Sequence, residues 1–459
     1  MDPDLYYHLA VAKIYSEYGK VEILTWGHDW LFKNSFGDTH LLFHQVLRLQ
    51  NWIPVKLIIS ILVALSVVVF LWIHKLKTTS QIIGFTLLFL FGSYGFTGRF
   101  LFAKGLLLFL PLFFLYYYFW KKQSNKILFL LAFISVWSYP LSPLIIVFST
   151  IDLFVTFFLS KKKNLLWRPF SYSLFGFLSG LIFHPSFPNQ FKIFYIEWVL
   201  QIFQPDGLEK IAEWASPDTQ LFLISFVVIL IIGIIHFKDS DKNLAFLFFI
   251  GLIASYTTTK SIEWTVPIGF LWIASSEKFR ANLDLPFSKQ MFLPIALIGT
   301  SLLGSGVYEQ LKSQNNGKRE YASFLCRKLA IDNNIWLNWD KFQEFVYECP
   351  NKIYTFGLNP LYSFANDKER YSLIQKFWHK PMEDNSNIPI YLGYNTAIIF
   401  PESESREILN HMIKNPAWEL KYIFNHAFVF LNKANPDTNQ KKEMKIINKN
   451  FNLPNNIGN

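Results

Sequence analysis

Two carboxylates and a histidine stand close together at the amino terminus, at a spacing that suits acid–base chemistry. Asp2 and Asp4 flank Pro3, and His8 follows Asp4 by one helical turn. Residues four apart share a helix face, so Asp4 and His8 are expected to meet. Such a pair can take a proton from a hydroxyl or bind a divalent cation. The alternative is local: Pro3 suits the first turn of a helix, and acidic residues suit its positive end.

A second segment repeats this pattern. Asp38 is followed by His40 and His44, which are again one helical turn apart. With His8, and with Glu213 from a later external loop, these side chains form a candidate site for an acceptor or for a metal ion such as Mg²⁺ or Mn²⁺. The alternative is a capping aspartate followed by interfacial histidines that pack among aromatic rings.

Two cations stand beside apolar runs on the same side of the membrane. Arg99 and Lys104 flank the expected outer ends of two membrane spans. Burying such a charge in hydrocarbon costs roughly 2.5–3.5 kcal/mol, so we expect both side chains at the outer surface or in a polar cavity. External cations beside external carboxylates suit a phosphate-bearing ligand such as a lipid pyrophosphate. The alternative is that both side chains simply extend to the membrane surface.

The elements that carry these residues are mostly apolar. Of the 459 residues, 52% are hydrophobic, and these are clustered in blocks. A run of about 17–25 apolar residues can cross a bilayer as a helix. Clear runs lie near 54–74, 81–97, 103–120, 141–160, 170–184, 218–237, 243–257 and 291–308, and two shorter runs lie near 127–139 and 264–277.

Basic residues mark every second connection between these runs, with examples at Lys77, Lys162 and Lys238. Because cytoplasmic loops carry the excess of Lys and Arg, we expect about ten spans, with 1–53, 185–217 and 309–459 outside the cytoplasm. The same pattern accounts for the net charge of +10 without nucleic acid, and the sequence lacks the interleaved aromatic and basic residues that grip single strands. Residues 1–53 then require an upstream membrane helix absent from this chain, or translocation driven by the helix that follows.

Residues 309–459 have the mixed composition of a water-soluble domain and alternate between strand and helix patterns. Strands are expected at Ile335–Asn338, Lys352–Phe356, Ile388–Tyr394, Ala397–Pro401 and Tyr422–Leu431, and helices at Asp367–Trp378 and Ser405–Lys414. No phosphate loop or nucleophile elbow occurs there, so the domain is expected to bind or brace.

Cys326 and Cys349 are the two cysteines of the chain, and both fall in the expected soluble domain. Disulfides persist outside the cytoplasm, so we expect a bridge between them. The alternative is two buried, inert cysteines.

Several segments, in order, resemble a family of bacterial GT-C-like polytopic membrane proteins. These proteins are distantly similar to protein O-mannosyltransferases and to the catalytic subunits of oligosaccharyltransferases. The segments that carry the resemblance are Asp2–Leu9, Phe36–His40 with His44, Ile211–Asp218, Asn338–Asp340 and Tyr354–Pro360. The resemblance implies a GT-C-like transmembrane domain over 1–308 and a small extracytoplasmic α/β domain over 309–459.

The resemblance also implies a function. A GT-C enzyme transfers a sugar from a polyprenyl-phosphate donor, here to an envelope glycan, lipid or protein outside the inner membrane of a bacterium. Asp4, and less directly Asp2, would be the catalytic base or metal ligand, and Arg99 and Lys104 would face the lipid phosphate. In two respects the sequence departs from the family pattern: no membrane helix precedes the first loop, and Asn359 stands where the family usually has Asp.

Two other classes of protein remain open. The first is a non-catalytic envelope scaffold or flippase-like partner that keeps the GT-C shell. The second is a small-molecule transporter, which is less favoured because transporters place charges near the membrane midplane between repeats. Asp152 is the one such charge within the expected spans, and the sequence has no clear repeat.

Overall fold

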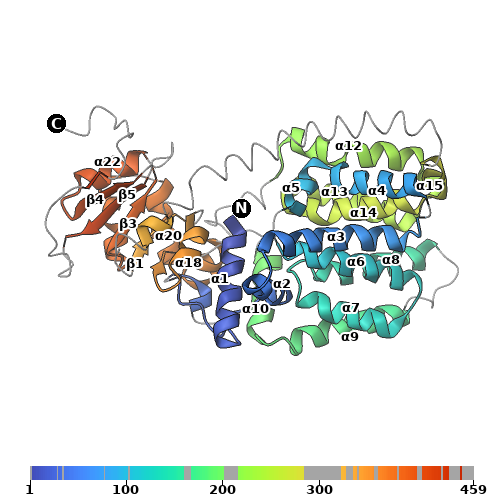
Figure 1. Ribbon diagram of the computed structural model, residues 1–459, viewed down its shortest axis with the longest axis horizontal. Coiled ribbons are helices and arrows are strands. Elements are labelled where there is room, and N and C mark those ends of the chain that lie inside the picture. The colour runs from blue at the N-terminus through green and yellow to red at the C-terminus, as the bar shows by residue number, and fades with distance from the viewer. Residues whose placement is uncertain are drawn as a thin grey trace.

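A bundle of helices and a smaller α/β part make up the computed structural model, and helix α1 (Pro3–Tyr18) lies between them (Figure 1). The structure describes residues 3–27, 29–33, 36–76, 78–101, 104–159, 167–200, 216–283, 322–326, 334–338, 341–355, 360–379, 382–400, 406–424, 427–433 and 445–446.

The helical bundle follows the apolar runs of the sequence. Its helices are α3 (Val55–Ile73), α4 (Thr79–Phe91), α5 (Tyr94–Leu101), α6 (Leu106–Lys121), α7 (Asn125–Val136), α8 (Pro143–Leu159), α9 (Trp167–Ile182), α12 (Thr219–Ile235), α13 (Lys242–Thr257), α14 (Ile262–Ser275) and the short α15 (Glu277–Asn282). Every expected run up to residue 277 is therefore helical, and the run at 291–308 lies outside the described residues.

The expected run at 81–97 is bent, because α4 and α5 meet at an angle of 85°. The hydroxyl of Thr97 donates to the carbonyl of Leu90 at 2.6 Å, which satisfies a backbone group near the bend. Of the described helices, only α3 is long and apolar enough to cross a membrane, and the bent pair makes a second if it counts as one span. A domain of ten spans stays a prediction.

Close helix packing in the bundle depends on small residues. Helices α7 and α9 lie side by side where Gly176 faces the backbone of Phe129. A Cβ atom on Gly176 would lie 2.2 Å from the carbonyl oxygen of Phe129, so a larger side chain would force the helices apart. Helix α14 lies in the middle of the bundle, with Val266 and Phe270 fully buried.

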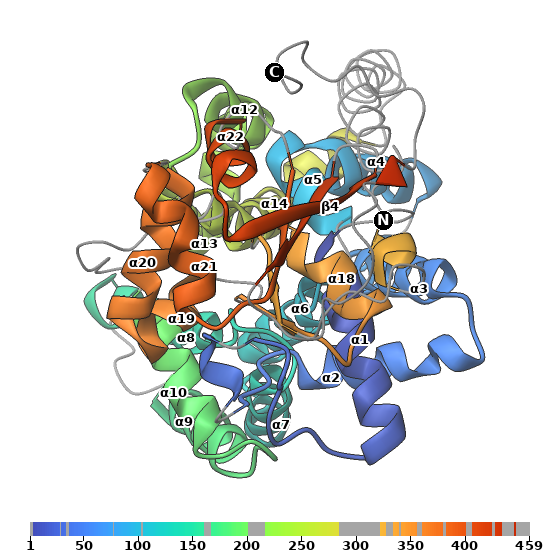
Figure 2. The same ribbon diagram turned by 90° about the vertical axis from the view of Figure 1, so that its left-hand side faces the viewer.

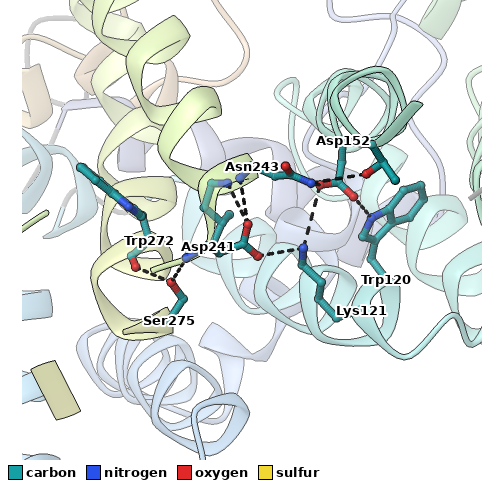
Figure 3. A network of polar contacts seen from close by, with 9 residues as sticks. Trp120, Lys121, Asp152, Asp241, Asn243, Trp272 and Ser275 are labelled. Atoms are coloured by element: carbon teal, nitrogen blue, oxygen red, sulfur yellow. Dashed lines mark hydrogen bonds and ion pairs between the residues drawn. The ribbon is translucent and has the colours of Figure 1, made fainter. Parts of the chain in front are cut away.

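A polar network joins α6, α8 and α13 (Figure 3). The buried carboxylate of Asp152 accepts from the indole of Trp120 at 2.8 Å and from the amide of Asn243 at 2.5 Å. Lys121 forms an ion pair with Asp241 at 2.8 Å. The network lies at the carboxyl end of α6, a helix about 24 Å long. Asp152 therefore has hydrogen-bond partners that hold three helices together, as expected of a structural charge.

The α/β part contains a six-stranded sheet in the order β2-β1-β3-β5-β4-β6. The strands are β1 (Asn334–Trp336), β2 (Ile353–Tyr354), β3 (Thr396–Ile399), β4 (Trp418–Phe424), β5 (Ala427–Asn432) and β6 (Lys445–Ile446). Strand β1 is parallel to β2 and β3, and β5 is antiparallel to both of its neighbours.

Two expected strands of this part are wrong. Tyr422–Leu431 is a pair of antiparallel strands, because Phe424 pairs with Ala427 and the chain reverses between them. Ile388–Tyr394 begins as the short helix α21 (Ile388–Tyr391), in which Pro389 occupies the first turn. Proline has no amide hydrogen for a sheet, and its fixed φ suits a helix start.

Helices cover both faces of the sheet. Side chains that alternate along the strands point to opposite faces: Trp336 packs with α20 (Lys368–His379) and α22 (Arg406–Lys414), whereas Ile335 packs with α18 (Phe342–Glu348). Figure 2 shows α20, α21 and α22 together beside β4. The patterns for α20 and α22 are confirmed, while α18 and α19 (Pro360–Asn366) were not predicted.

The amino-terminal segment belongs to the packing of the α/β part. Helix α1 packs on α18, and Gly27 forms a parallel bridge with Tyr354 at the β2 edge of the sheet. The amide of Tyr354 donates to the carbonyl of Trp26 at 2.5 Å. Trp30 shares a hydrophobic cluster with Phe342. The described residues of this segment, expected to go with the helices, thus pack against both the bundle and the α/β part.

A disulfide joins Cys326 to Cys349, with their Cα atoms 5.8 Å apart. This Cα separation is within the usual range for a disulfide. The bridge ties the helical turn at 322–326 to the residue that caps α18. It therefore braces the element on which α1 packs.

Candidate functional site

One cleft brings together residues from distant parts of the chain. It lies where α1, the segment before α2 (Leu41–Leu47), the residues before α6 and the turn Thr259–Ser261 converge. Its acidic, basic and imidazole lining consists of Asp4, His8, Asp38, His40, His44, Lys104, Glu197 and Lys260. Aromatic side chains, among them Tyr7, Tyr139 and Tyr362, complete its walls.

Asp4 occupies the first turn of α1 and forms an ion pair with Lys104 at 2.8 Å. The Asp4 side chain keeps 25% of its surface exposed, while Lys104 keeps 10%. Asp4 is therefore the more accessible of the two charges. The structure brings together the acid and the cation that the sequence had placed 100 residues apart.

Behind this ion pair lies a buried chain of hydrogen bonds. Nδ1 of His44 lies 2.8 Å from the Asp38 carboxylate, and Nε2 of His44 lies 2.8 Å from Nδ1 of His8. The hydroxyl of Tyr15 donates to the same Asp38 carboxylate at 2.9 Å, and the amide of His40 donates to its other oxygen at 2.9 Å. Helix α1 supplies His8 and Tyr15 to this network, and α2 with the residues before it supplies His44, His40 and Asp38.

The surroundings of these groups shift their titration in opposite directions. Burial alone would raise the pKa of Asp38, but the charge and hydrogen bond of His44 and the contacts with His40 hold it below its usual value. Burial lowers the pKa of His8 well below its usual value, and it lowers the pKa of His40 to about 3. At neutral pH the cleft therefore holds an ionised Asp38 beside a neutral His8 and a neutral His40.

Arg99 does not line the cleft. Its guanidinium donates to the fully buried carboxylate of Glu263 at 2.7 Å. The other oxygen of Glu263 accepts from the hydroxyl of Tyr139 at 2.8 Å, and Tyr139 does line the cleft. Arg99 therefore supports the wall of the cleft, and its expected contact with a ligand phosphate stays a prediction.

Glu197, Lys260 and Tyr362 are among the lining residues that were not expected at the site. The hydroxyl of Tyr362, on α19, donates to Glu197, which follows α10 (Asn189–Tyr195) in the expected loop 185–217. Lys260 comes from the connection between α13 and α14. The sequence carried a signal for two of these residues. Lys260 lies in a connection expected on the outer side, and Glu197 begins a Glu-Trp pair in the expected external loop.

Asp2 and Glu213 lie outside the described residues, so the structure neither places them in the cleft nor separates them from it. Cys326 and Cys349 are not among the residues that line it. Of the expected site residues, Asp4, His8, Asp38, His40, His44 and Lys104 are brought together.

The donor atoms near the cleft do not fit a divalent cation in this arrangement. Within the ranges that the structure describes, no group of three His, Cys, Asp or Glu side chains is arranged to hold a metal ion. Both ring nitrogens of His44 are engaged in hydrogen bonds, and Asp4 faces Lys104. A bound Mg²⁺ or Mn²⁺ ion stays a prediction and takes no part in the chemistry proposed for this cleft.

The fold is similar to that of an archaeal oligosaccharyltransferase, AglB from Archaeoglobus fulgidus. Its apo structure aligns with 94% of this chain and 70% of that chain, with a TM-score of 0.55 and 11% identity. Its complex with an inhibitory peptide and a dolichol-phosphate aligns with 90% of this chain and 67% of that chain, with a TM-score of 0.55 and 10% identity. At such identities the likeness shows the fold alone.

A third structure of the A. fulgidus oligosaccharyltransferase is tethered through a disulfide to an acceptor peptide containing the NVT sequon. It aligns with 87% of this chain and 65% of that chain, with a TM-score of 0.51 and 12% identity. No protein-family model matches the sequence, and no match was found among curated proteins.

Proposed function

We propose that this protein is a GT-C-type membrane glycosyltransferase. It transfers a sugar from a polyprenyl-phosphate-linked donor to an envelope glycan, lipid or protein outside the inner membrane of a bacterium. The observation that carries this proposal is the Asp4–Lys104 pair in a cleft between the helical bundle and the α/β part. The likeness to an oligosaccharyltransferase supports glycosyl transfer with a lipid-linked donor at the level of the superfamily.

The cations of the cleft suit the donor phosphate. The leaving group is a polyprenyl phosphate, which needs charge stabilisation more than it needs protonation. Lys104 and Lys260 both line the cleft, so this role passes to them, and Arg99 is left to hold Glu263. A lysine acts on a phosphate as a point charge and can follow the developing charge as the sugar departs.

Asp4 lies beside the cations, where the acceptor hydroxyl must approach the donor. Its carboxylate directs that hydroxyl toward the sugar carbon, or takes its proton. Placing a nucleophile and a donor in register is by itself a large part of catalysis. The α/β part contributes Tyr362 to the same cleft, so it forms one wall of the acceptor side.

A second candidate is a non-catalytic envelope scaffold or flippase-like partner. The Asp4–Lys104 ion pair is compatible with it as well, because Lys104 can neutralise Asp4 without either side chain reacting. Consumption of the donor separates the two candidates, since a scaffold binds a lipid-linked sugar without cleaving it.

The test uses the purified chain in lipid nanodiscs with radiolabelled polyprenyl-phosphate hexoses and an envelope extract as acceptor. Release of polyprenyl phosphate is measured, because this product is the same whatever the acceptor. Asp4→Asn should lower the rate by about 10²–10⁴-fold, while asparagine still suits the helix start. Glu17→Gln is the matched control, because Glu17 is a half-exposed carboxylate elsewhere on α1. If the wild type releases no polyprenyl phosphate from any donor, the scaffold becomes the better account.

A further inference from the structure

The Asp38–His44–His8 chain has the geometry of a proton relay. All three side chains are at most 2% exposed. Two hydrogen bonds of 2.8 Å connect the Asp38 carboxylate, through both ring nitrogens of His44, to Nδ1 of His8. The hydroxyl of Tyr15 and the amide of His40 also donate to the Asp38 carboxylate and fix its position. Such buried and connected hydrogen bonds leave little freedom in the position of each ring.

The positions of the hydrogens follow from the charged end of the chain. An ionised carboxylate can only accept, so Nδ1 of His44 carries a hydrogen. With that hydrogen on Nδ1, Nε2 of His44 accepts the second hydrogen bond, and Nδ1 of His8 donates to it. Neutral His8 is left with its lone pair on Nε2. No described residue forms a hydrogen bond with that atom, and His8 lines the cleft.

We propose that His8 Nε2 accepts the proton of the acceptor hydroxyl during sugar transfer, and that Asp38 and His44 are the positioning residues that hold its ring with Nε2 toward the cleft. This inference rests on the proposed function and deepens it. It replaces a metal site at these residues with a relay, since both ring nitrogens of His44 are already engaged in hydrogen bonds.

The step balances without any further reactant. The acceptor O–H bond breaks and its proton goes to His8 Nε2, while the oxygen forms a bond with the anomeric carbon of the sugar. The bond between that carbon and the phosphate oxygen breaks, and its electron pair leaves with the polyprenyl phosphate. The new charge on His8 is shared along the hydrogen bonds toward Asp38. The proton then passes to solvent through the cleft.

Asp4 and His8 therefore have different roles: Asp4 orients the acceptor hydroxyl, and His8 takes its proton. Asp4 is one turn before His8 on α1 and is held by Lys104, so its carboxylate directs the hydroxyl. The charged and titratable groups around His8 are His40 and His44 from the α2 segment, Lys104 from the residues before α6, and Asp4 and Tyr7 from α1 itself. Burial, together with His40, His44 and Lys104, lowers the pKa of His8, so its Nε2 lone pair stays unprotonated until the acceptor binds.

The first test reads the hydrogens directly and does not depend on activity. The full chain is prepared in nanodiscs with ¹⁵N-labelled histidine, and the His8 and His44 signals are assigned from the spectra of His8→Gln and His44→Gln. The expected result is a neutral His8 with its hydrogen on Nδ1 and a bare Nε2. A His8 that carries its hydrogen on Nε2 would overturn the relay, because no lone pair would then face the cleft.

The second test uses the release of polyprenyl phosphate. His8→Gln should lower kcat/KM by about 10²–10⁴-fold and abolish the fall in rate at acidic pH. Asp38→Asn should move that fall to lower pH, because a neutral amide stabilises protonated His8 less. Should Asp38→Asn fail to fold, His44→Gln breaks the same connection and should also move the fall in rate to lower pH. His74→Gln is the control, because His74 is a buried histidine that caps α3 outside the cleft.

The outcomes separate the two proposals. If the wild type releases polyprenyl phosphate and His8→Gln does so equally well with the same pH profile, the role of His8 is refuted and the proposed function stands. If the wild type releases none, both the proposed function and the catalytic role of His8 fail. A wild-type rate that disappears with a chelator and returns with Mg²⁺ or Mn²⁺ would also overturn the relay in favour of a metal site.

Discussion

Asp29 offers the sharpest test of how the amino-terminal segment is attached to the α/β part. Its carboxylate is 3% exposed and forms an ion pair with Arg370. The hydroxyl of Tyr394 donates to it at 2.6 Å, and the Asp29 amide donates to the carbonyl of Thr355 at 3.3 Å. One residue thus contacts α20, the residue that follows β2 and a residue two positions before β3. We predict that Asp29→Ala destabilises the α/β part.

The magnitude follows from what the change leaves behind. Removing one partner of a fully buried ion pair costs about 3–5 kcal/mol, because the remaining charge stays buried. Arg370 keeps 32% of its side chain exposed, so water can partly replace the carboxylate. The hydroxyl of Tyr394 retains the carbonyl of Thr355 at 3.2 Å. We therefore expect a loss of about 2–3 kcal/mol in the free energy of unfolding.

The assay is chemical denaturation of the full chain in nanodiscs, together with hydrogen exchange of the segment 341–355. The amide of Tyr354, which donates to Trp26, should lose protection in Asp29→Ala. Glu22→Gln is the control, because Glu22 lies in the same segment with its side chain 69% exposed, and it should leave both measurements unchanged. A change below about 0.5 kcal/mol for Asp29→Ala, the range of ordinary surface substitutions, would refute the attachment through Asp29.

Three further predictions follow from the fold and the site. The pKa of His40 falls to about 3 on folding, so the unfolded chain binds a proton that the folded chain does not between pH 6.5 and 3. Stability should therefore fall by up to about 1.4 kcal/mol per pH unit on acidification, and His40→Gln should reduce that slope in denaturation curves. An alkaline phosphatase fused at Asn459 should be active and one fused near Lys162 inactive, and the reverse pattern would place the cleft in the cytoplasm. Cys326 and Cys349 should resist alkylation until reduced, and mass spectrometry that finds both thiols alkylated without reduction would contradict the bridge.

The sequence by itself determined the local elements and the spacing within each of them. Long apolar runs form helices because a helix satisfies the hydrogen bonds of its own backbone in apolar surroundings. The observed helices begin and end close to the expected runs. The one-turn spacings of Asp4 with His8 and of His40 with His44 depend only on helix geometry. Both pairs accordingly line the cleft.

Only the tertiary structure decided which partner each charge takes. Arg99 and Lys104 read alike in the sequence, yet one pairs with Glu263 in the bundle and the other with Asp4 in the cleft. Lys260 reaches the same cleft from the turn before α14. Each choice is made by helices that are distant in sequence and become neighbours when the bundle packs. No local pattern records such contacts, because they depend on the relative rotation and depth of whole helices.

The same holds for the amino-terminal segment and the sheet. Trp26 and Gly27 join the sheet at Tyr354, more than three hundred residues later in the chain. A sheet edge offers free backbone groups to any extended segment that reaches it, so the pairing carries no signature in the side chains of that segment. The sequence therefore specified a helix with Asp4 and His8 on one face. The packing of that helix between the bundle and the α/β part made the face a wall of the cleft.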